Sequence, residues 1–381
     1  MSRTMPLMLA AALVLAGCGG TSGTGGDTAT LPDTEDTARD TAVDEQDDPD
    51  AAPDAVEDPV EEDAAEEEPA PAPVVTCSDD PPTGADLPDP VPVYAGTCPT
   101  LAAGRNTITS GGSAREFLLA VPADMDPAER LPVAFLWHWL GGDAAEFFEK
   151  GEVQPAVDEI RFIAVAPEAK GDLLMKWPFL LLDSEARMEE EARFFDDMLA
   201  CVAEQLNVNA SCVSSVGVSS GALWTSQLAQ LRSTRLASFL SLSGGTGVPG
   251  DYFNPVHAWT GATHKLPAMV LWGGPTDFCG LSFSVTSGNL EAALVSDGHF
   301  FVECIHNCAH AQPPMTPPPG ESAYVSLWTF ILDHPYWLDD GESPYQTTGL
   351  PGAYPEWCGI GPGSATIREG ECSSGPLGDC F

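Results

Sequence analysis

Basic residues are scarce in this chain of 381 residues, because Lys and Arg together number 15 against 57 Asp and Glu. The formal net charge is −42. Proteins that bind nucleic acids or other anionic polymers neutralise their partner with clusters of Lys and Arg, and no stretch of this sequence gathers such a cluster. We therefore exclude nucleic acid as a partner and anionic polymers as substrates.

The sequence also lacks an apolar run long enough to cross a bilayer as a helix, which takes about 20 residues. The apolar stretch Met5 to Leu15 is shorter, follows Arg3 and leads into Leu15-Ala16-Gly17-Cys18, as in an export signal. A thiol directly after two small residues resembles a bacterial lipoprotein signal. We expect residues 1–18 to be that signal and Cys18 to carry the lipid, which would anchor the protein to a membrane of the cell envelope. An ordinary cleaved signal, giving a secreted protein, is the alternative.

Aromatic residues are absent from residues 19–76, which hold 19 Asp and Glu, a single Arg39 and many Pro, Ala, Thr and Gly. Such a segment buries too little apolar surface to offset its ordering entropy, and its like charges repel. We expect a disordered, extended stalk. Calcium binding by the acidic run is not favoured, because the spacing of an EF-hand loop is missing.

Cysteine, in contrast, is plentiful. Ten cysteines follow Cys18, and an even number in an exported protein indicates disulfides: Cys77, Cys98, Cys201, Cys212, Cys279, Cys304, Cys308, Cys358, Cys372 and Cys380. Their pairing does not follow from the sequence, although Cys201–Cys212 across a helix-to-strand turn is a plausible local bridge. The Gly-, Pro- and Cys-rich tail, residues 351–381, is expected to depend on such bridges.

Strand-like and helix-like segments alternate through residues 77–350, which we take as the catalytic domain. The expected strands are 115–121, 131–140, 162–167, 212–216, 237–242, 267–272 and 300–305, and the expected helices are 184–206, 222–231, 282–296 and 322–332. The strand at 131–140 is almost continuously apolar, as in a central strand covered on both faces. This order predicts an α/β fold with a mostly parallel central sheet and helices on both faces.

The motif Gly217-Val218-Ser219-Ser220-Gly221 lies between an expected strand and an expected helix. Strand, G-x-S-x-G and helix together are the context of a nucleophile elbow, a tight turn that presents a serine hydroxyl. The sequence therefore predicts Ser219 as a nucleophile.

A serine hydroxyl needs a base, and the base needs an acidic partner. In α/β-hydrolases these follow the serine in the order acid, then histidine. Asp277 comes directly after the strand 267–272, and His310 follows the next strand. We predict Asp277 as the acid and His310 as the base. Asp277 as a helix cap is the alternative for the acid, and His306 and His299 are the alternatives for the base.

A zinc site is a competing interpretation of Cys304, His306, Cys308 and His310. Disulfides are favoured over it, because the protein is expected in an oxidising compartment and no second ligand pair completes a tetrahedral site. We predict no metal and no organic cofactor.

These motifs resemble those of secreted esterases related to polyhydroxybutyrate depolymerases and to feruloyl and acetylxylan esterases, within the α/β-hydrolase superfamily. The resemblance covers about Arg115 to Pro335 and rests on Leu131-Pro-Val-Ala-Phe-Leu-Trp-His138 followed by Gly141-Gly142, on Ala166-Pro167, on Gly217-Val-Ser-Ser-Gly221, on Gly273-Gly-Pro-Thr-Asp277, on the cysteine-flanked His310 and on Trp328-Thr-Phe-Ile-Leu-Asp-His-Pro335. It implies the α/β-hydrolase fold and gives Ser219, Asp277 and His310 the roles of nucleophile, acid and base.

One position departs from the family pattern. The loop after the first central strand usually reads His-Gly followed by further glycines, whereas here Trp139 follows His138. That loop normally supplies one backbone N–H of the oxyanion hole, and Ser220 after the nucleophile supplies the other. We expect Ser220, Leu140 and Trp139 to form the hole. Two alternatives stay open: the loop presents the Leu140 N–H with a different geometry, or Trp139 lines the substrate cleft. His138 is expected to order this loop.

The sequence thus predicts an exported, lipid-anchored serine ester hydrolase that forms an acyl-enzyme and acts on a small or polymeric ester. Two alternatives stay open. A serine peptidase would use the same triad, and a surface lipoprotein that binds without catalysis would keep the fold alone.

Overall fold

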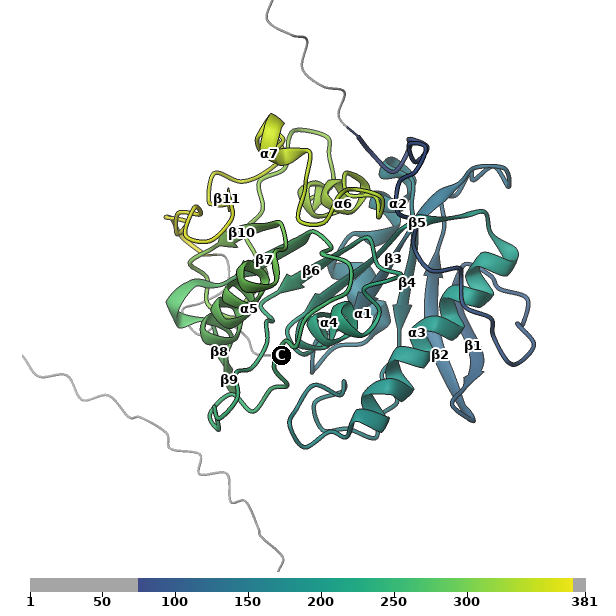
Figure 1. Ribbon diagram of the computed structural model, residues 1–381, viewed down its shortest axis with the longest axis horizontal. Helices are drawn as coiled ribbons and strands as arrows, with labels where there is room; N and C mark the ends of the chain where they lie inside the picture. The colour runs from purple at the N-terminus through teal and green to yellow at the C-terminus, as the bar shows by residue number, and fades with distance from the viewer. Residues whose placement is uncertain (1–74, 373–381) are drawn as a thin grey trace, which may run out of the picture. The chain divides into compact units, whose positions relative to one another are not determined.

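Nine strands form one sheet in the computed structural model, which describes residues 75–372. Its spatial order is β1-β2-β4-β3-β5-β6-β7-β10-β11 (Figure 1). The strands are β1 (Gly104–Ser110), β2 (Ser113–Ala120), β3 (Leu131–Trp137), β4 (Ile163–Pro167), β5 (Val208–Val218), β6 (Ser238–Leu242), β7 (Ala268–Trp272), β10 (Phe301–Ile305) and β11 (Cys358–Ile360). The six strands from β4 to β10 pair in parallel, whereas β1, β2 and β11 join the edges antiparallel.

Helices cover both faces of the sheet. The helices are α1 (Ala144–Lys150), α2 (Val153–Ile160), α3 (Glu185–Gln205), α4 (Ser220–Leu231), α5 (Phe283–Asp297), α6 (Val325–Leu332) and α7 (Tyr345–Thr348). One apolar core holds side chains of α3, α4 and α5, and the other holds side chains of α1, α2, α6 and α7. Short elements follow β7: the 3-10 turn η1 (Gly274–Thr276) and the two-stranded ribbon of β8 (Phe278–Cys279) and β9 (Leu281–Ser282).

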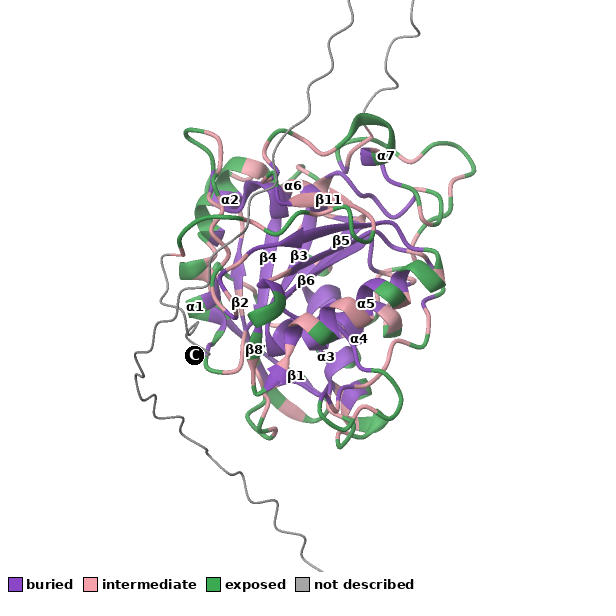
Figure 2. Ribbon diagram, turned by 90° about the vertical axis from the view of Figure 1, so that its left-hand side faces the viewer, coloured by how far each residue is buried: buried purple, intermediate pink, exposed green. Residues whose placement is uncertain are grey.

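The central strands form because alternate side chains have an apolar layer on each side. Every residue of β3 is buried; Phe135 enters the core on one face, and Ala134 and Leu136 enter the core on the other. This double burial explains the continuous apolar run in the sequence. Figure 2 shows the strands buried and the exposed residues on outward helix faces and loops.

The predicted α/β class, with a mostly parallel sheet and helices on both faces, is confirmed. Each strand and helix expected from the sequence is present, with ends that differ by a few residues. The edge strands β1 and β11 and the helices α1, α2 and α7 were not predicted. The first edge strand was missed because its buried side holds Asn106 and Ser110 beside the single apolar Ile108, so it carries little apolar signal.

The expected signal at residues 1–18, the lipidation of Cys18 and nearly all of the stalk at 19–76 lie outside the described residues. Residues 373–381 of the tail also lie outside them. Among residues 75–372, no helix combines the length and the hydropathy that a membrane crossing demands.

Four disulfides join residues of the described range, and their partners are far apart in sequence: Cys77–Cys212, Cys98–Cys201, Cys304–Cys358 and Cys308–Cys372. The predicted Cys201–Cys212 bridge is wrong. Cys201 belongs to the last turns of α3 and Cys212 to the middle of β5, and each meets a cysteine of the segment that precedes β1. Such bonds persist in oxidising compartments outside the cytoplasm.

A pair of buried carboxyls lies between α5 and β10. Glu291 and Glu303 are 8% and 4% exposed, and Trp272 Nε1 donates to Glu291 Oε1 over 3.0 Å. Burial, followed by the charge of Glu303, raises the pKa of Glu291 to about 8. Glu291 is therefore a neutral acid in the folded protein at pH 7.

This carboxyl makes the stability depend on pH. The folded pKa of about 8 lies above the ordinary 4.5, so the contribution of Glu291 is fully present below pH 4.5 and is lost as the pH rises through 8. Between these values one bound proton changes the free energy of unfolding by about 1.4 kcal/mol per pH unit. We expect Glu291→Gln to flatten this loss in urea unfolding measured from pH 5 to pH 8. Glu204→Gln, at an exposed position of α3, is the control; equal slopes in both variants would contradict the assignment.

Candidate active site

The loops that follow the parallel strands meet at one edge of the sheet, because parallel strands have their carboxyl ends on the same side. The loops after β5, β7 and β10 carry Ser219, Asp277 and His310 in turn. The loop after β3 carries His138, Trp139 and Leu140. The topology thus places all predicted site residues along a single edge.

Ser219 lies at the turn between β5 and α4, where the backbone is strained. Its φ of 56° and ψ of −119° fall in a region that residues other than glycine rarely adopt. The Ser219 N–H still donates to Leu242 O of β6 over 2.9 Å. The turn therefore holds the serine side chain at the end of the strand, which is the geometry of a nucleophile elbow.

The two glycines of the motif are required by close packing. A Cβ on Gly221 would lie 2.0 Å from Trp137 O, and a Cβ on Gly217 would lie 2.2 Å from Gly221 O. Both contacts are with backbone atoms, which cannot move aside without shifting β3 or α4. The first turn of α4 therefore rests directly on the end of β3.

The structure brings Ser219, Asp277 and His310 into one chain of hydrogen bonds. His310 Nε2 lies 2.9 Å from Ser219 Oγ, and His310 Nδ1 lies 2.7 Å from Asp277 Oδ1. All three residues are buried, and Asp277 is 0% exposed. An Nδ1–H that donates to the carboxylate leaves Nε2 free to accept the serine proton.

Two further groups hold the second carboxylate oxygen of Asp277. Ser243 Oγ and the Gly273 N–H each donate to Asp277 Oδ2 over 2.8 Å. Ser243 follows β6 and has a φ of 48°. The sequence does not point to Ser243, because no local pattern indicates which hydroxyl reaches a carboxylate 34 positions away.

His310 is held from its own loop and from α5. The Phe283 ring stacks on the His310 ring with centroids 4.2 Å apart, and the Cys308–Cys372 disulfide fixes the chain two residues before it. The Ala309 N–H donates to Gly273 O over 3.1 Å, which joins this loop to the one that carries Asp277. Phe283 is another contact that the sequence did not indicate.

The alternative histidines lie elsewhere. His299 contacts Asp297 and Leu266 O, and His306 accepts a hydrogen bond from the Cys308 N–H. Burial lowers the pKa of His306 to about 4, so this side chain is neutral at pH 7. Since Cys304 and Cys308 are bonded to other cysteines, they are not available as the thiolate ligands that the zinc interpretation requires.

Of the predicted oxyanion residues, Ser220 directly follows the serine, and Trp139 lines the same cavity as Ser219. Ser220 is the first residue of α4, so its N–H has no acceptor within the helix. This N–H belongs to the positive end of the helix dipole. Trp139, Leu140 and Gly142 belong to a turn closed by the Gly142 N–H on Trp139 O at 3.1 Å. The Trp139 indole folds over Gly142, where an added Cβ would lie 2.5 Å from it.

A largely apolar cavity of about 300 Å³ opens next to Ser219 and His310. The Lys150 ammonium lies 4.9 Å over the Trp139 ring, so both side chains bound the cavity on the α1 side. The other lining side chains are mainly Phe147, Val216, Val218, Leu242, Leu271, Gln312, Pro313, Tyr324, Leu327 and Trp328. Gln312 donates to the Tyr324 hydroxyl within the same wall. Such a cavity fits a small apolar group attached to a reacting carbonyl.

No protein-family model matches the sequence, and no curated protein matches it either. The fold is similar to that of solved structures. Native pOPH aligns at a TM-score of 0.57 and 16% identity over 73% of this chain and 100% of that chain. Native sOPH aligns at a TM-score of 0.51 and 18% identity over 71% and 97%. Together with the sheet order and the elbow, these similarities identify an α/β-hydrolase-like fold.

The packing of the elbow predicts opposite effects of the same substitution at two helical glycines. Gly221→Ala forces a backbone shift, so we expect it to destabilise the protein by more than about 2 kcal/mol. Gly288→Ala, in α5, has nothing within 4 Å of the added Cβ and should be neutral or stabilise by about 0.5–1 kcal/mol. Thermal unfolding of both variants measures the difference; a stable Gly221→Ala would show that α4 does not rest on β3 as described.

Proposed function

We propose that the protein is a serine hydrolase that cleaves carboxylic esters through an acyl-enzyme. The observation that carries the proposal is the hydrogen-bond chain from Ser219 Oγ through His310 to Asp277, at the wall of an apolar cavity. The α/β-hydrolase-like fold supports it, because the serine lies at the elbow where this fold presents its nucleophile.

In the proposed reaction, Ser219 Oγ attacks the ester carbonyl while its proton passes to His310 Nε2. The tetrahedral intermediate then collapses, and the departing alcohol takes the proton from His310. A water molecule attacks the acyl-enzyme with His310 again as the base, which releases the acid and restores Ser219. No step requires a cofactor.

Asp277 would act on the histidine and not on the substrate. Its Oδ1 fixes the imidazole with the proton on Nδ1 and stabilises the imidazolium that forms during attack. Ser243 and the Gly273 N–H keep Oδ2 occupied, so the carboxylate cannot rotate away from the ring.

The negative charge on the carbonyl oxygen would be held by backbone donors. We assign the N–H groups of Ser220 and Leu140 to this oxyanion hole, with Trp139 lining the cavity beside them. Donors aimed at this position act where the charge develops, and loss of one typically costs about 10²–10³-fold in kcat.

The cavity supports esters with a small apolar group on one side of the carbonyl. Within this class we propose substrates like those of polyhydroxybutyrate depolymerases and feruloyl esterases, polymeric esters included. One of the similar solved structures is a pOPH variant in complex with pNPB, with a TM-score of 0.55 and 15% identity. We also propose export, with Cys18 as the lipid anchor and residues 19–76 as a stalk; the disulfides support an extracytoplasmic location.

A covalent probe tests the nucleophile. A fluorophosphonate should label the wild-type protein, and Ser219→Ala should remove the label and lower kcat on p-nitrophenyl esters by about 10⁶-fold. Ser226→Ala is the matched control, since its hydroxyl only donates to Ala222 O within α4. A wild type that is labelled no better than Ser219→Ala would favour the binding lipoprotein. Cleavage of amides as well as esters would favour the peptidase.

The acid can be tested separately from the nucleophile. Asp277→Asn should lower kcat by about 10⁴-fold, because an amide NH₂ against Nδ1 selects the wrong tautomer. Ser243→Ala keeps the carboxylate and removes one of its donors, so we expect a loss of about tenfold, in line with one charge-assisted hydrogen bond. Equal losses in the two variants, measured per labelled site, would contradict the assignment of Asp277.

A further inference from the structure

The side chain of His138 holds the peptide group that joins Trp139 to Leu140. His138 Nδ1 lies 2.9 Å from Trp139 O. A carbonyl oxygen only accepts, so His138 Nδ1 carries the hydrogen and donates. The Gly142 N–H donates to the same oxygen from the other side of the turn.

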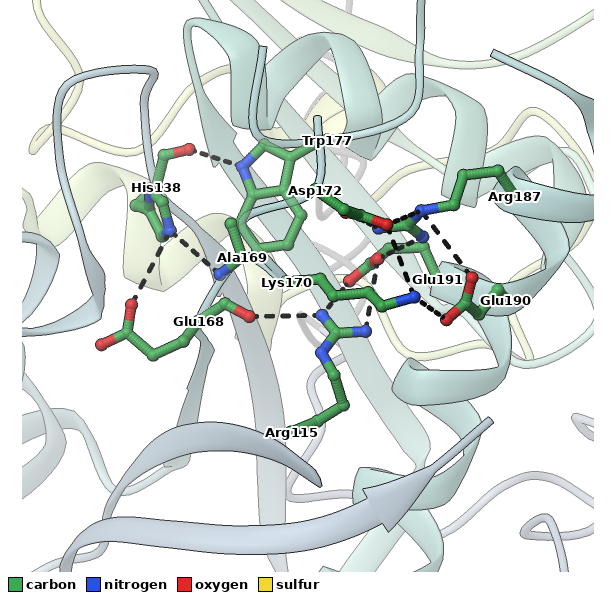
Figure 3. Close-up of polar contacts among 10 residues, drawn as sticks. All are labelled: Arg115, His138, Glu168, Ala169, Lys170, Asp172, Trp177, Arg187, Glu190 and Glu191. Atoms are coloured by element: carbon green, nitrogen blue, oxygen red, sulfur yellow. Dashed lines mark hydrogen bonds and ion pairs between the residues drawn. The ribbon is translucent and has the colours of Figure 1, made fainter. Parts of the chain in front are cut away.

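The other nitrogen of His138 must then accept. The Ala169 N–H donates to His138 Nε2 over 3.4 Å, and the Glu168 carboxylate lies 3.9 Å from the same atom (Figure 3). His138 is 1% exposed, and this burial lowers its pKa. The ring is thus neutral, with both nitrogens engaged by backbone groups, and it has no free position from which to act as a base.

A second donor fixes the carbonyl of His138 itself. Trp177 Nε1 donates to His138 O over 2.8 Å, and the Trp177 ring packs against the His138 ring with centroids 4.9 Å apart. Trp177 and Ala169 both belong to the segment between β4 and α3. The loop after β3 is therefore fastened to this neighbouring segment at two points.

The neighbouring segment is fastened in turn by a buried ion pair. Arg115 of β2 donates to Glu168 O over 3.2 Å and pairs with Glu191 of α3 over 2.5 Å, with both side chains almost fully buried (Figure 3). Arg187 bridges Glu191 to Asp172. The segment that holds His138 is therefore tied to both β2 and α3.

The direction of the Leu140 N–H follows from this carbonyl. The C=O and N–H of a trans peptide point in opposite directions, because the unit is planar. With Trp139 O directed to the His138 ring, the Leu140 N–H is directed away from that ring. Trp139 lines the same cavity as Ser219. Gly221, two residues after Ser219, packs against the carbonyl oxygens of Trp137 and His138, which directly precede Trp139.

We infer that His138 is a positioning residue, which aims the Leu140 N–H at the oxyanion by holding the Trp139 carbonyl, with Ala169 and Trp177 keeping the ring in place. This inference rests on the proposed ester hydrolysis. It assigns the segment between β4 and α3 a part in transition-state stabilisation, although that segment supplies no side chain to the triad.

Two substitutions of His138 separate its two hydrogen bonds. In His138→Asn the amide nitrogen takes the place of Nδ1 and keeps the bond to Trp139 O, but the acceptor for Ala169 is lost. In His138→Gln the amide oxygen takes the place of Nε2 and keeps the Ala169 bond, but the donor to Trp139 O is lost. The two variants are similar in polarity and leave Ser219, His310 and Asp277 unchanged.

We expect His138→Gln to lower kcat by about 10- to 100-fold with KM unchanged, because only the transition state carries the oxyanion. The Gly142 N–H still restrains the carbonyl, so the loss should stay below that of a deleted donor. His138→Asn should retain kcat within a few-fold. Rates are measured per active site titrated with fluorophosphonate, which removes the effect of any unfolded fraction.

Binding of a boronic acid, which forms a tetrahedral adduct with Ser219, provides a second measurement. Its inhibition constant should rise in His138→Gln by the same factor by which kcat falls. If His138→Gln does not fold, Trp177→Phe keeps an aromatic ring at this position and removes the donor to His138 O. As with His138→Gln, we expect Trp177→Phe to lower kcat and leave KM unchanged, with a smaller loss in kcat.

The outcomes distinguish this inference from the proposed function. Equal kcat per titrated site in wild type and His138→Gln would overturn the role of His138 while leaving the esterase intact. Equal losses in His138→Asn and His138→Gln would also overturn it, because the loss would then reflect general damage to the loop. A wild type without esterase activity would refute the proposed function itself, through the Ser219 experiment.

Discussion

The contact between the first turn of α4 and the end of β3 is the constraint on which the site depends. With no Cβ on Gly221, the helix backbone reaches Trp137 O, and the turn before it must take the strained conformation of Ser219. The same contact brings the loop after β3 beside the serine. One backbone packing thus places Ser219 next to the loop after β3, and the strain at Ser219 persists because the sheet on both sides leaves no room to relax it.

Around this contact, Asp277 and His310 are each held by further groups. Asp277 accepts from Ser243 and the Gly273 N–H, His310 is stacked by Phe283, and a disulfide fixes the loop that carries His310. Buried polar groups need partners, and here each partner also restricts rotation. The site is therefore preorganised, so little reorganisation would accompany the transfer of a proton from Ser219 to His310.

The sequence predicted the parts of the molecule whose signal is local. The apolar run at 131–140 and the G-x-S-x-G motif each appear within a short stretch, and Ser219, Asp277 and His310 each follow a strand that the sequence predicts. The structure brings these three residues together. The missed features arise from contacts across the chain. Ser243 reaches Asp277 over 34 positions, and Cys98 reaches Cys201 over 103, which no local pattern records. The wrong Cys201–Cys212 pairing came from treating nearness in sequence as nearness in space.

The backbone and the packing around Trp139 explain how the loop after β3 accommodates a bulky residue. The φ of Trp139 lies outside the left-handed region, so this position does not need glycine for its backbone. What it needs is room for the indole, and Gly142 provides that room, since a Cβ there would lie 2.5 Å from the indole ring. Phe147 and Lys150 of α1 then hold the indole at the cavity wall. Trp139 therefore changes the shape of the cavity, whereas the inferred direction of the Leu140 N–H depends on His138.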